Sequence, residues 1–187
     1  MIELGAYWAH YSMWLKKVRK QAKVIMVEPD PANLAAGRNN FKRNGFHGEF
    51  IGAVVAKGRW QLDLFLQSRG IQRVDILHVD IQGFEGDMIA GAGNALSNMF
   101  VDYLFVSTHS QGIHHRIVAE LSKFGYRIEV VSDYDNETTS SDGLVFASSL
   151  RSKQIFRDFS HIGRTKILAS RPNELVQVVL NAAKARA

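Results

Sequence analysis

The most informative stretch of the sequence is VDILHVDIQGFE, residues 74–85. Its first part is rich in Val and Ile, which predicts a strand over residues 74–81. Gly83 then marks a turn, and the apolar pattern that follows predicts a helix over residues 85–96. A strand that leads through a short turn into a helix is typical of βαβ units, so this stretch indicates a parallel sheet.

The same alternation of strands and helices extends in both directions along the chain, and it predicts an α/β fold. Further strands are predicted at residues 1–4, 23–27, 50–55, 60–66, 103–106, 127–131 and 144–148. Further helices are predicted at residues 8–22, 31–44, 114–124 and 172–184. The strands at 50–55 and 60–66 flank Lys57-Gly58-Arg59, so we expect them to form a hairpin.

The composition excludes several classes of protein. With 187 residues, of which 46% are hydrophobic and 22% charged, the chain is typical of one globular domain. The absence of cysteine excludes disulfide scaffolds, thiolate metal sites and cysteine nucleophiles. No apolar run is long enough to span a bilayer, and the N-terminus lacks the features of a signal peptide, so we expect a cytoplasmic protein.

The chain is basic, with 23 Lys and Arg against 18 Asp and Glu and a formal net charge of +5. Much of the excess lies in two predicted helices. We interpret it as two solvated helix faces and consider a nucleic-acid partner the less favoured alternative. The aromatic residues Trp8, Tyr11 and Trp14 recur at helical spacing, and we expect them to lie in the core rather than to form a platform for substrate.

Acidic residues stand at the ends of three predicted strands: Glu3, Glu28 and Asp80. In an open parallel sheet, ligands bind beyond the carboxyl ends of the strands, so these three side chains mark one candidate site. Glu28 is expected to accept both ribose hydroxyls of a nucleoside through charge-assisted hydrogen bonds. Gly5 is expected to let the backbone approach the ligand closely.

The glycine pattern selects among the nucleoside cofactors. A dinucleotide fold needs G-x-G-x-x-G, because the pyrophosphate lies against closely approaching backbone. The first turn here has only Gly5, followed by the large residues Tyr7 and Trp8, and no G-K-[ST] phosphate loop occurs in the chain. S-adenosylmethionine carries no phosphate, so it fits this turn better than a nucleotide does.

These stretches together resemble the FkbM family of S-adenosylmethionine-dependent methyltransferases. The resemblance runs from Met1 to about Ser149. It rests on residues 3–12, on 27–31 with Asn33, Asn40 and Asn44, on 74–85, and on His109-Ser110 and Asp142-Gly143-Leu144. Its most specific part is Asp80-Ile81-Gln82-Gly83-Phe84-Glu85, which corresponds to the family pattern D-[IV]-E-G-x-E.

The resemblance implies a class I methyltransferase fold, a seven-stranded, mostly parallel sheet with an antiparallel last strand and helices on both faces. It also implies methyl transfer to a hydroxyl oxygen, often on a sugar, a glycan or a natural product. We therefore predict S-adenosyl-L-methionine as cofactor and a small-molecule hydroxyl acceptor as partner. The alternatives are an RNA methyltransferase and a non-catalytic nucleoside-binding module of the same fold.

The predicted site has a cofactor side and a catalytic side. His109 is the candidate base for the acceptor hydroxyl, and Asp80 is expected to position that hydroxyl. Asp80 and His109 could also bind a divalent metal ion. Because no third ligand is identifiable, no metal site is predicted. The residues predicted to bind the cofactor are Glu3, Gly5, Ala6, Tyr7, Glu28, Pro29, Ala53 and Asp80.

The chain departs from the family at several positions. Tyr7 and Ala9 stand where the family motif D-x-G-A-N-x-G has Asn and Gly, and Gln82 replaces the usual Glu. These departures are the basis of the non-catalytic alternative. We expect a methyltransferase domain at residues 1–150 and a basic C-terminal appendage ending in a helix at residues 151–187. Relatives usually carry a segment before the first strand, and the sequence leaves open whether the domain is truncated at its N-terminus.

Overall fold

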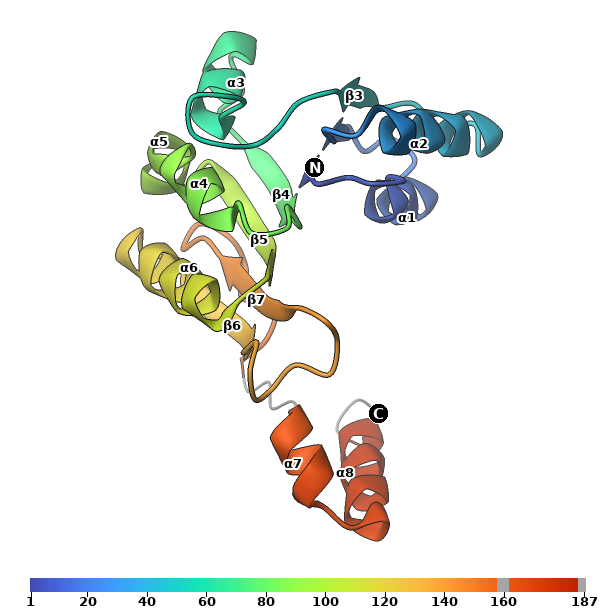
Figure 1. The fold of residues 1–187 in the computed structure, drawn as a ribbon, viewed down its shortest axis with the longest axis vertical. Helices are drawn as coiled ribbons and strands as arrows, with labels where there is room; N and C mark the ends of the chain where they lie inside the picture. The colour runs from blue at the N-terminus through green and yellow to red at the C-terminus, as the bar shows by residue number, and fades with distance from the viewer. Residues whose placement is uncertain (158–161, 185–187) are drawn as a thin grey trace.

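The computed structural model of the chain describes residues 1–157 and 162–184. Seven strands form one sheet in the order β3-β2-β1-β4-β5-β7-β6 (Figure 1). The strands are β1 (Ile2–Leu4), β2 (Ile25–Val27), β3 (Glu49–Ile51), β4 (Val74–Val79), β5 (Val101–Thr108), β6 (Arg127–Ser132) and β7 (Gly143–Ser148). Strands β1 to β5 pair in parallel, and β7 pairs antiparallel with β5 and β6. The predicted sheet with an antiparallel last strand is confirmed.

Helices cover both faces of this sheet (Figure 1). On one face lie α1 (His10–Val18) and α2 (Pro31–Arg43); on the other lie α3 (Leu62–Arg69), α4 (Glu85–Ala90), α5 (Gly93–Ser97) and α6 (Gln111–Lys123). Successive side chains of β2 point to opposite faces of the sheet, so this one strand packs against the helices on both faces. Met26 packs with Phe41 of α2, whereas Val27 belongs to the larger core on the other face.

The predicted strand at residues 60–66 is wrong, and so is the hairpin. Residues 62–69 form α3, and Val55 and Trp60 make only an isolated parallel bridge. The apolar residues of this segment fit both the two-residue period of a strand and the 3.6-residue period of a helix. Leu62, Phe65 and Leu66 are buried at helical spacing, while Leu64 is 58% exposed. Helix α3 buries its apolar face in the main core, and this packing decides between the two periods.

The prediction that the aromatic residues of the first helix lie in the core is also wrong. Trp8 is 48% exposed, Trp14 is 68% exposed, and Tyr11 is partly exposed as well. Helix α1 is anchored instead by polar contacts of its buried residues, Ser12 and Lys16. Lys16 donates hydrogen bonds to the carbonyl oxygens of Lys20 and Ala22, which follow the helix.

The C-terminal segment extends away from the sheet (Figure 1). It contains the predicted helix, α8 (Pro172–Lys184), and a helix that the sequence pattern did not predict, α7 (Arg164–Ala169). Backbone hydrogen bonds from Arg164 and Thr165 to the loop between β6 and β7 hold α7 in place. None of the helices in the described ranges has the length and apolar character that crossing a bilayer requires.

Candidate active site

The strand register brings the three acidic strand ends to one edge of the sheet. Leu4, the last residue of β1, pairs with Val27 on one side and with Val79 on the other. Glu28 and Asp80 therefore emerge beside Gly5, as predicted. Backbone hydrogen bonds fix this arrangement: Gly5 N donates to Val27 O at 2.9 Å, and Asp80 N donates to Leu4 O at 2.9 Å.

Glu28 is buried and holds two loops together. It is 6% exposed, and its carboxylate accepts hydrogen bonds from Tyr7 N at 2.8 Å and Asp30 N at 3.0 Å. The side chain therefore joins the turn after β1 to the start of α2. A carboxylate has about four acceptor positions, so further positions are available to ligand hydroxyls.

Glu3 is almost completely buried, with 1% exposure, and one of its oxygens lacks a partner. Oε2 accepts hydrogen bonds from the Ser12 amide, at 3.1 Å, and from the Ser12 hydroxyl. Oε1 has no hydrogen-bond donor among the described residues. Burial raises the pKa of Glu3 to about 7. A cationic donor near Oε1 would favour the ionised carboxylate.

Two departures from the family motif fall where the backbone is left-handed. Tyr7 has φ 48° and Ala9 has φ 62°. Asn and Gly, the family residues, adopt this conformation more readily than Tyr or Ala, so the motif and the turn agree in geometry. Within the turn Ala6 is buried, and the Tyr7 ring stacks on Trp8 with ring centroids 4.5 Å apart.

Gly5 lies where two strand ends approach each other closely. Its φ is +75°, and an added Cβ would lie 1.6 Å from the backbone oxygen of Asp80. Only glycine therefore lets the ends of β1 and β4 approach this closely, and its predicted contact with the cofactor stays a prediction. The remaining predicted residues lie at the same edge: Pro29 is exposed next to Glu28, and Ala53 lies beyond the end of β3 and packs against the core.

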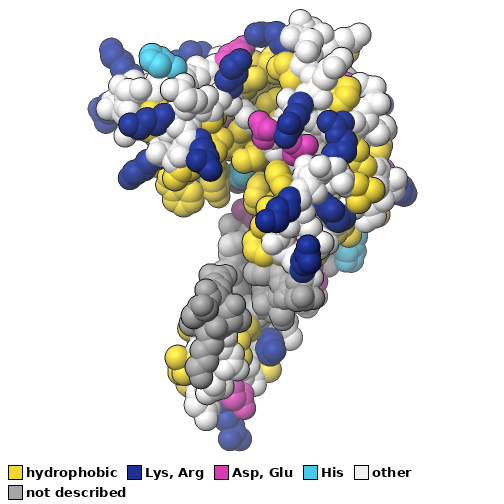
Figure 2. Space-filling model, turned by 180° about the vertical axis from the view of Figure 1, so that it is seen from behind, with side chains coloured by type: hydrophobic (Ala, Val, Ile, Leu, Met, Phe, Trp, Pro, Cys, Tyr) yellow, Lys and Arg dark blue, Asp and Glu magenta, His cyan; other side chains and the backbone are white. Residues whose placement is uncertain are grey.

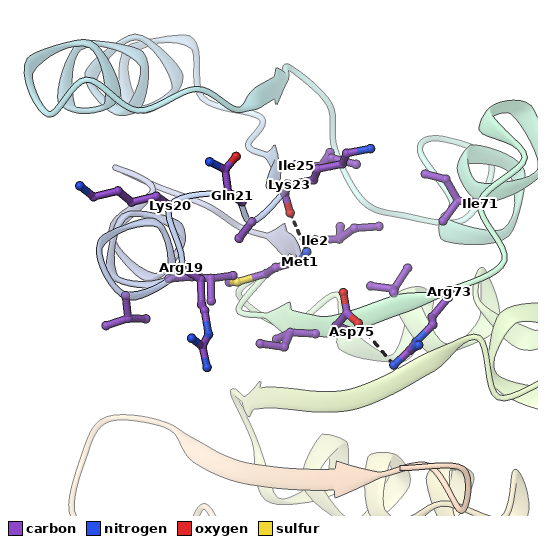
Figure 3. Close-up of a pocket in the computed structure, with 15 residues that line it drawn as sticks. Met1, Ile2, Arg19, Lys20, Gln21, Lys23, Ile25, Ile71, Arg73 and Asp75 are labelled. Carbon is purple, nitrogen blue, oxygen red and sulfur yellow. Dashed lines mark hydrogen bonds and ion pairs between the residues drawn. The ribbon is translucent and has the colours of Figure 1, made fainter. Parts of the chain in front are cut away.

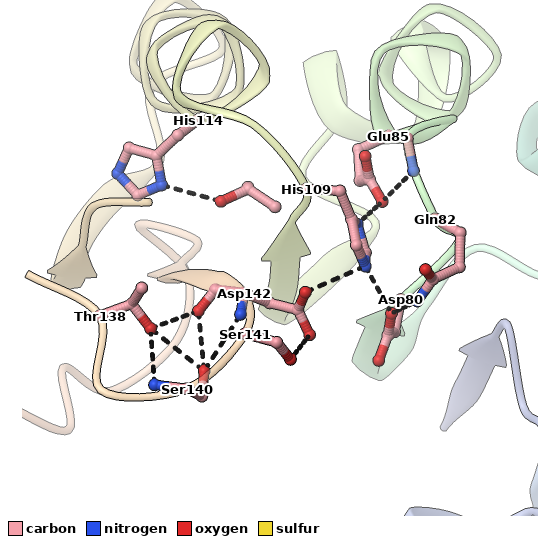
Figure 4. Close-up of polar contacts among 11 residues, drawn as sticks. Asp80, Gln82, Glu85, His109, His114, Thr138, Ser140, Ser141 and Asp142 are labelled. Carbon is pink, nitrogen blue, oxygen red and sulfur yellow. Dashed lines mark hydrogen bonds and ion pairs between the residues drawn. The ribbon is translucent and has the colours of Figure 1, made fainter. Parts of the chain in front are cut away.

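A second polar cluster surrounds His109, which follows β5. Nδ1 of His109 lies 2.7 Å from Oε1 of Glu85, and Nε2 lies 3.2 Å from Oδ1 of Asp80 and 3.4 Å from Oδ1 of Asp142 (Figure 4). Glu85, the first residue of α4, has no exposed surface and also accepts a hydrogen bond from Gly83 N. We name Asp80, Glu85, His109 and Asp142 the His109 cluster.

Burial and neighbouring negative charge shape this cluster. Burial raises the pKa of Asp80, and the nearby carboxylates of Asp142 and Glu85 act in the same direction, while His109 opposes them. Three carboxylates thus surround one imidazole. The cluster favours a positively charged or proton-donating ligand.

Asp142 is the member that sequence reasoning missed. It lies in a polar loop, and only its place in the family resemblance drew attention to it. Because β7 is antiparallel, it begins at the edge where the parallel strands end, and Asp142 immediately precedes it. An acidic residue directly before an antiparallel last strand is therefore the signal that could have identified it.

A cavity at the other edge of the sheet contains none of the predicted site residues. Its lining includes Met1, Ile25, Arg73 and Asp75, at the amino ends of the strands (Figure 3). There the Met1 amino group donates to Lys23 O, and Arg73 pairs with Asp75. The candidate site therefore rests on the two groups of acidic residues at the carboxyl edge.

Residues 59–128 match the family described as the methyltransferase FkbM domain. The matched range contains Asp80, Glu85 and His109. No curated protein sequence matches the chain.

The structure is similar to several solved methyltransferases. The precorrin-6y C5,15-methyltransferase of Geobacter metallireducens has 14% identity and a TM-score of 0.56, with 80% of this chain and 79% of that chain covered. TrmK of M. capricolum, in complex with S-adenosyl-homocysteine, has 12% identity and a TM-score of 0.59, with 82% and 64% covered. A putative tRNA methyltransferase of Streptococcus pneumoniae has 13% identity and a TM-score of 0.59, with 85% and 65% covered.

This chain spans less than two thirds of the length of the last two structures. At these identities the similarity concerns the fold. Together with the matched range, it confirms the resemblance stated from the sequence. The predicted resemblance to the FkbM methyltransferase domain is therefore confirmed over residues 59–128, and the chain shares its fold with solved S-adenosylmethionine-dependent methyltransferases.

Proposed function

We propose that this chain binds S-adenosylmethionine and transfers its methyl group to a hydroxyl oxygen of a small acceptor, such as a sugar, a glycan unit or a natural product. The observation that carries the proposal is Glu28, a buried carboxylate at the end of β2, next to the turn that follows β1. The family match and the fold support the reaction class.

The residues at the ends of β1 and β2 fit the cofactor. Glu28 would accept the ribose hydroxyls, and the orphaned Oε1 of Glu3 would accept the methionine ammonium group. Gly5, Ala6 and Tyr7 form the turn between these carboxylates, and Pro29 and Ala53 flank it as further cofactor-binding residues. When bound, S-adenosylmethionine supplies an electrophilic methyl group on a sulfonium centre.

The acceptor would lie on the other side of Asp80. Asp80 belongs to both sides, because it follows β4 between the cofactor turn and His109. We propose Asp80 and His109 as the catalytic residues that hold and activate the acceptor hydroxyl. In-line placement of oxygen, carbon and sulfur accounts for much of the acceleration in such a transfer.

The RNA alternative has less support from the surface. Lys16 is largely buried and closes the end of α1, and Lys20 and Lys23 line cavities at the edge of the sheet opposite Asp80. On the face that Figure 2 shows, Lys and Arg side chains are scattered rather than gathered in one patch. A positive surface that guides RNA would be expected near the reacting residues.

Calorimetric titration tests the cofactor. We expect S-adenosylhomocysteine to bind and NAD not to bind, and we expect Glu28→Gln to weaken S-adenosylhomocysteine at least tenfold, about 1.4 kcal/mol. Glu49→Gln is the matched control, because Glu49 begins β3 at the opposite edge and pairs with Arg69 at the surface. Equal affinity in Glu28→Gln and the wild type would overturn the cofactor assignment.

The acceptor is tested by transfer of labelled methyl groups. The chain is incubated with labelled S-adenosylmethionine and, in turn, with sugars, glycans, phenolic natural products and RNA. We expect label only in an O-methylated small molecule. Label in RNA would favour the RNA alternative. Binding of S-adenosylhomocysteine without transfer to any of these acceptors would favour the non-catalytic module.

A further inference from the structure

We propose that Asp80, His109 and Asp142 bind one divalent metal ion, and that this ion holds the acceptor oxygen for methyl transfer. These three side chains each offer one ligand atom, and the three atoms lie within 4.8 Å of one another. The role of the ion in catalysis rests on the proposed function, whereas the binding of the ion does not. The sequence alone provided two of the ligands, and the structure adds the third.

The hydrogen bond between His109 and Glu85 fixes which nitrogen of the imidazole carries the proton, and it leaves the other nitrogen free to bind a metal ion. Because a carboxylate can only accept, Nδ1 carries the proton in this contact, and Nε2 of a neutral ring presents a lone pair. That Nε2 is buried and has no hydrogen-bond partner among the described residues. A lone pair that faces two carboxylates is repelled by both, and a cation between them removes this repulsion.

The distances around Nε2 fit ligands of one ion. Two atoms bound about 2.1 Å from a metal at right angles are about 3.0 Å apart. Nε2 lies 3.2 Å from the Asp80 oxygen and 3.4 Å from the Asp142 oxygen, and neither contact is a hydrogen bond. The third pair, the Asp80 and Asp142 oxygens, lies within 4.8 Å, so the two carboxylates would turn toward the ion to complete the set of three ligands.

Glu85 completes the arrangement from behind the imidazole. A metal-binding histidine commonly donates its other N–H to a carboxylate, which orients the ring and strengthens the ligand. Glu85 is wholly buried at the start of α4, so it holds His109 in one position. Two carboxylates and one imidazole suit Mn²⁺ and related divalent ions, because carboxylate oxygen and imidazole nitrogen are both accepted ligands.

The bound ion would leave positions for the acceptor hydroxyl. Coordination lowers the pKa of that hydroxyl, so its proton passes to solvent and the oxygen becomes nucleophilic. An oxygen–carbon bond to the methyl group forms as the carbon–sulfur bond breaks, and its electron pair stays on sulfur. The products are the methyl ether, S-adenosylhomocysteine and the released proton. His109 is then a metal ligand instead of the base that the sequence predicts.

Binding of Mn²⁺ to the chain without S-adenosylmethionine tests the site. We expect saturable binding of one Mn²⁺ per chain. The decrease of the electron paramagnetic resonance signal of free Mn²⁺ measures this binding. Asp142→Asn is expected to weaken binding at least tenfold. The matched control is Asp135→Asn, since Asp135 is an exposed carboxylate in the same loop. This variant is expected to bind Mn²⁺ with the affinity of the wild type.

The imidazole ligand has its own signature. Pulsed electron paramagnetic resonance of bound Mn²⁺ is expected to show coupling to a ¹⁴N nucleus, and His109→Gln is expected to abolish that coupling. Absence of saturable Mn²⁺ binding would overturn the proposal. Equal binding in Asp142→Asn and the wild type, or bound Mn²⁺ without nitrogen coupling, would do so as well.

Failure of this site and failure of the proposed function give different results. If S-adenosylhomocysteine binds but Mn²⁺ does not, the metal site is wrong and the methyltransferase proposal stands. If Mn²⁺ binds but S-adenosylhomocysteine does not, the metal site stands and the proposed function is wrong. Circular dichroism of each variant separates lost ligands from lost folding.

Discussion

Two groups of carboxylates lie at the carboxyl ends of the strands, and they differ in the hydrogen-bond and ion-pair partners that they have. On the β1–β2 side, Glu28 accepts hydrogen bonds from two backbone amides, and Glu3 is bonded to Ser12. On the β4–β5–β7 side, the main partner that Asp80 and Asp142 share is His109. The first group is built into the loops, and the second surrounds one imidazole.

This difference shows how one sheet edge can serve two kinds of ligand. Carboxylates that accept backbone amides are already fixed, so they can recognise hydroxyls and an ammonium group with little rearrangement. Carboxylates gathered around a lone pair favour a cation. On this basis we propose that the first group binds the cofactor and that the second binds the metal ion and the acceptor.

The largest effect is expected where the two groups are joined. Gly5→Ala places a Cβ against the Asp80 carbonyl at a left-handed backbone position. We expect the free energy of unfolding to fall by more than about 4 kcal/mol, because the backbone of one strand end must move. Urea denaturation followed by circular dichroism measures the loss.

Gly45→Ala is the control for this substitution. Gly45 also has a positive φ, of 64°, but an added Cβ would meet nothing within 4 Å. Its cost is therefore the conformational one, about 1 kcal/mol. Similar losses at the two glycines would show that the contact between Gly5 and Asp80 does not join the two groups.

The next largest effect is the change in the free energy of unfolding with pH that the ionisation of Glu3 causes. Its folded-state pKa of about 7 lies above the ordinary value of 4.5, so between these values the folded chain keeps a proton that the unfolded chain has released. Stability contributed by this group falls as the pH rises from about 4.5 to 7, by about 3 kcal/mol in all. Urea denaturation at pH 5 and pH 8 measures this change.

Glu3→Gln cannot ionise, so this part of the pH dependence is expected to disappear. The wild type is expected to lose about 2 to 3 kcal/mol more than Glu3→Gln between pH 5 and pH 8. Parallel pH profiles for the two proteins would contradict the burial of an ionisable group at this position.

A smaller effect is expected at Glu85. Glu85→Gln replaces the carboxylate that accepts the His109 proton by a weaker, neutral acceptor. We expect Mn²⁺ affinity to fall about tenfold, or about 1.4 kcal/mol, since such supporting partners change metal affinity by about 10- to 100-fold. Calorimetry with Mn²⁺ measures it, and S-adenosylhomocysteine affinity is expected to stay unchanged. A matching loss of S-adenosylhomocysteine affinity would show that the two groups are not separate.

The smallest effect is expected at Trp14. Its side chain is 68% exposed, so Trp14→Ser is expected to lower the free energy of unfolding by less than about 1 kcal/mol. Phe41→Ala, in the neighbouring helix α2, removes a buried ring and is expected to cost about 3–5 kcal/mol. A loss at Trp14 as large as the loss at Phe41 would restore the core position that the sequence suggests.

The sequence predicts most of the sheet and the carboxylates at the ends of three strands, for reasons that depend on local pattern. Strand β4 is recognisable because a run of branched residues ends in a turn, and Glu28 because it stands at the end of a strand. Helix α3 was missed because its apolar residues fit both periods, and tertiary packing decided between them. The exposure of Trp14 follows from the polar anchoring of α1, which periodicity does not reveal.

The site was predicted less completely than the fold. Glu3, Glu28 and Asp80 could be placed together because parallel strands end at one edge. Asp142 comes to His109 only through the reversal of β7, which places the start of a late strand beside the ends of earlier ones. Such a contact depends on strand direction, which the family resemblance implies but the loop sequence around Asp142 does not encode.

A crystal structure with S-adenosylhomocysteine tests the central assignment most directly. We predict that the Glu28 carboxylate accepts both ribose hydroxyls at about 2.7 Å, with the sulfur atom turned toward Asp80 and His109. A nucleoside bound at the cavity lined by Met1 and Arg73, or one whose ribose does not touch Glu28, would contradict the account.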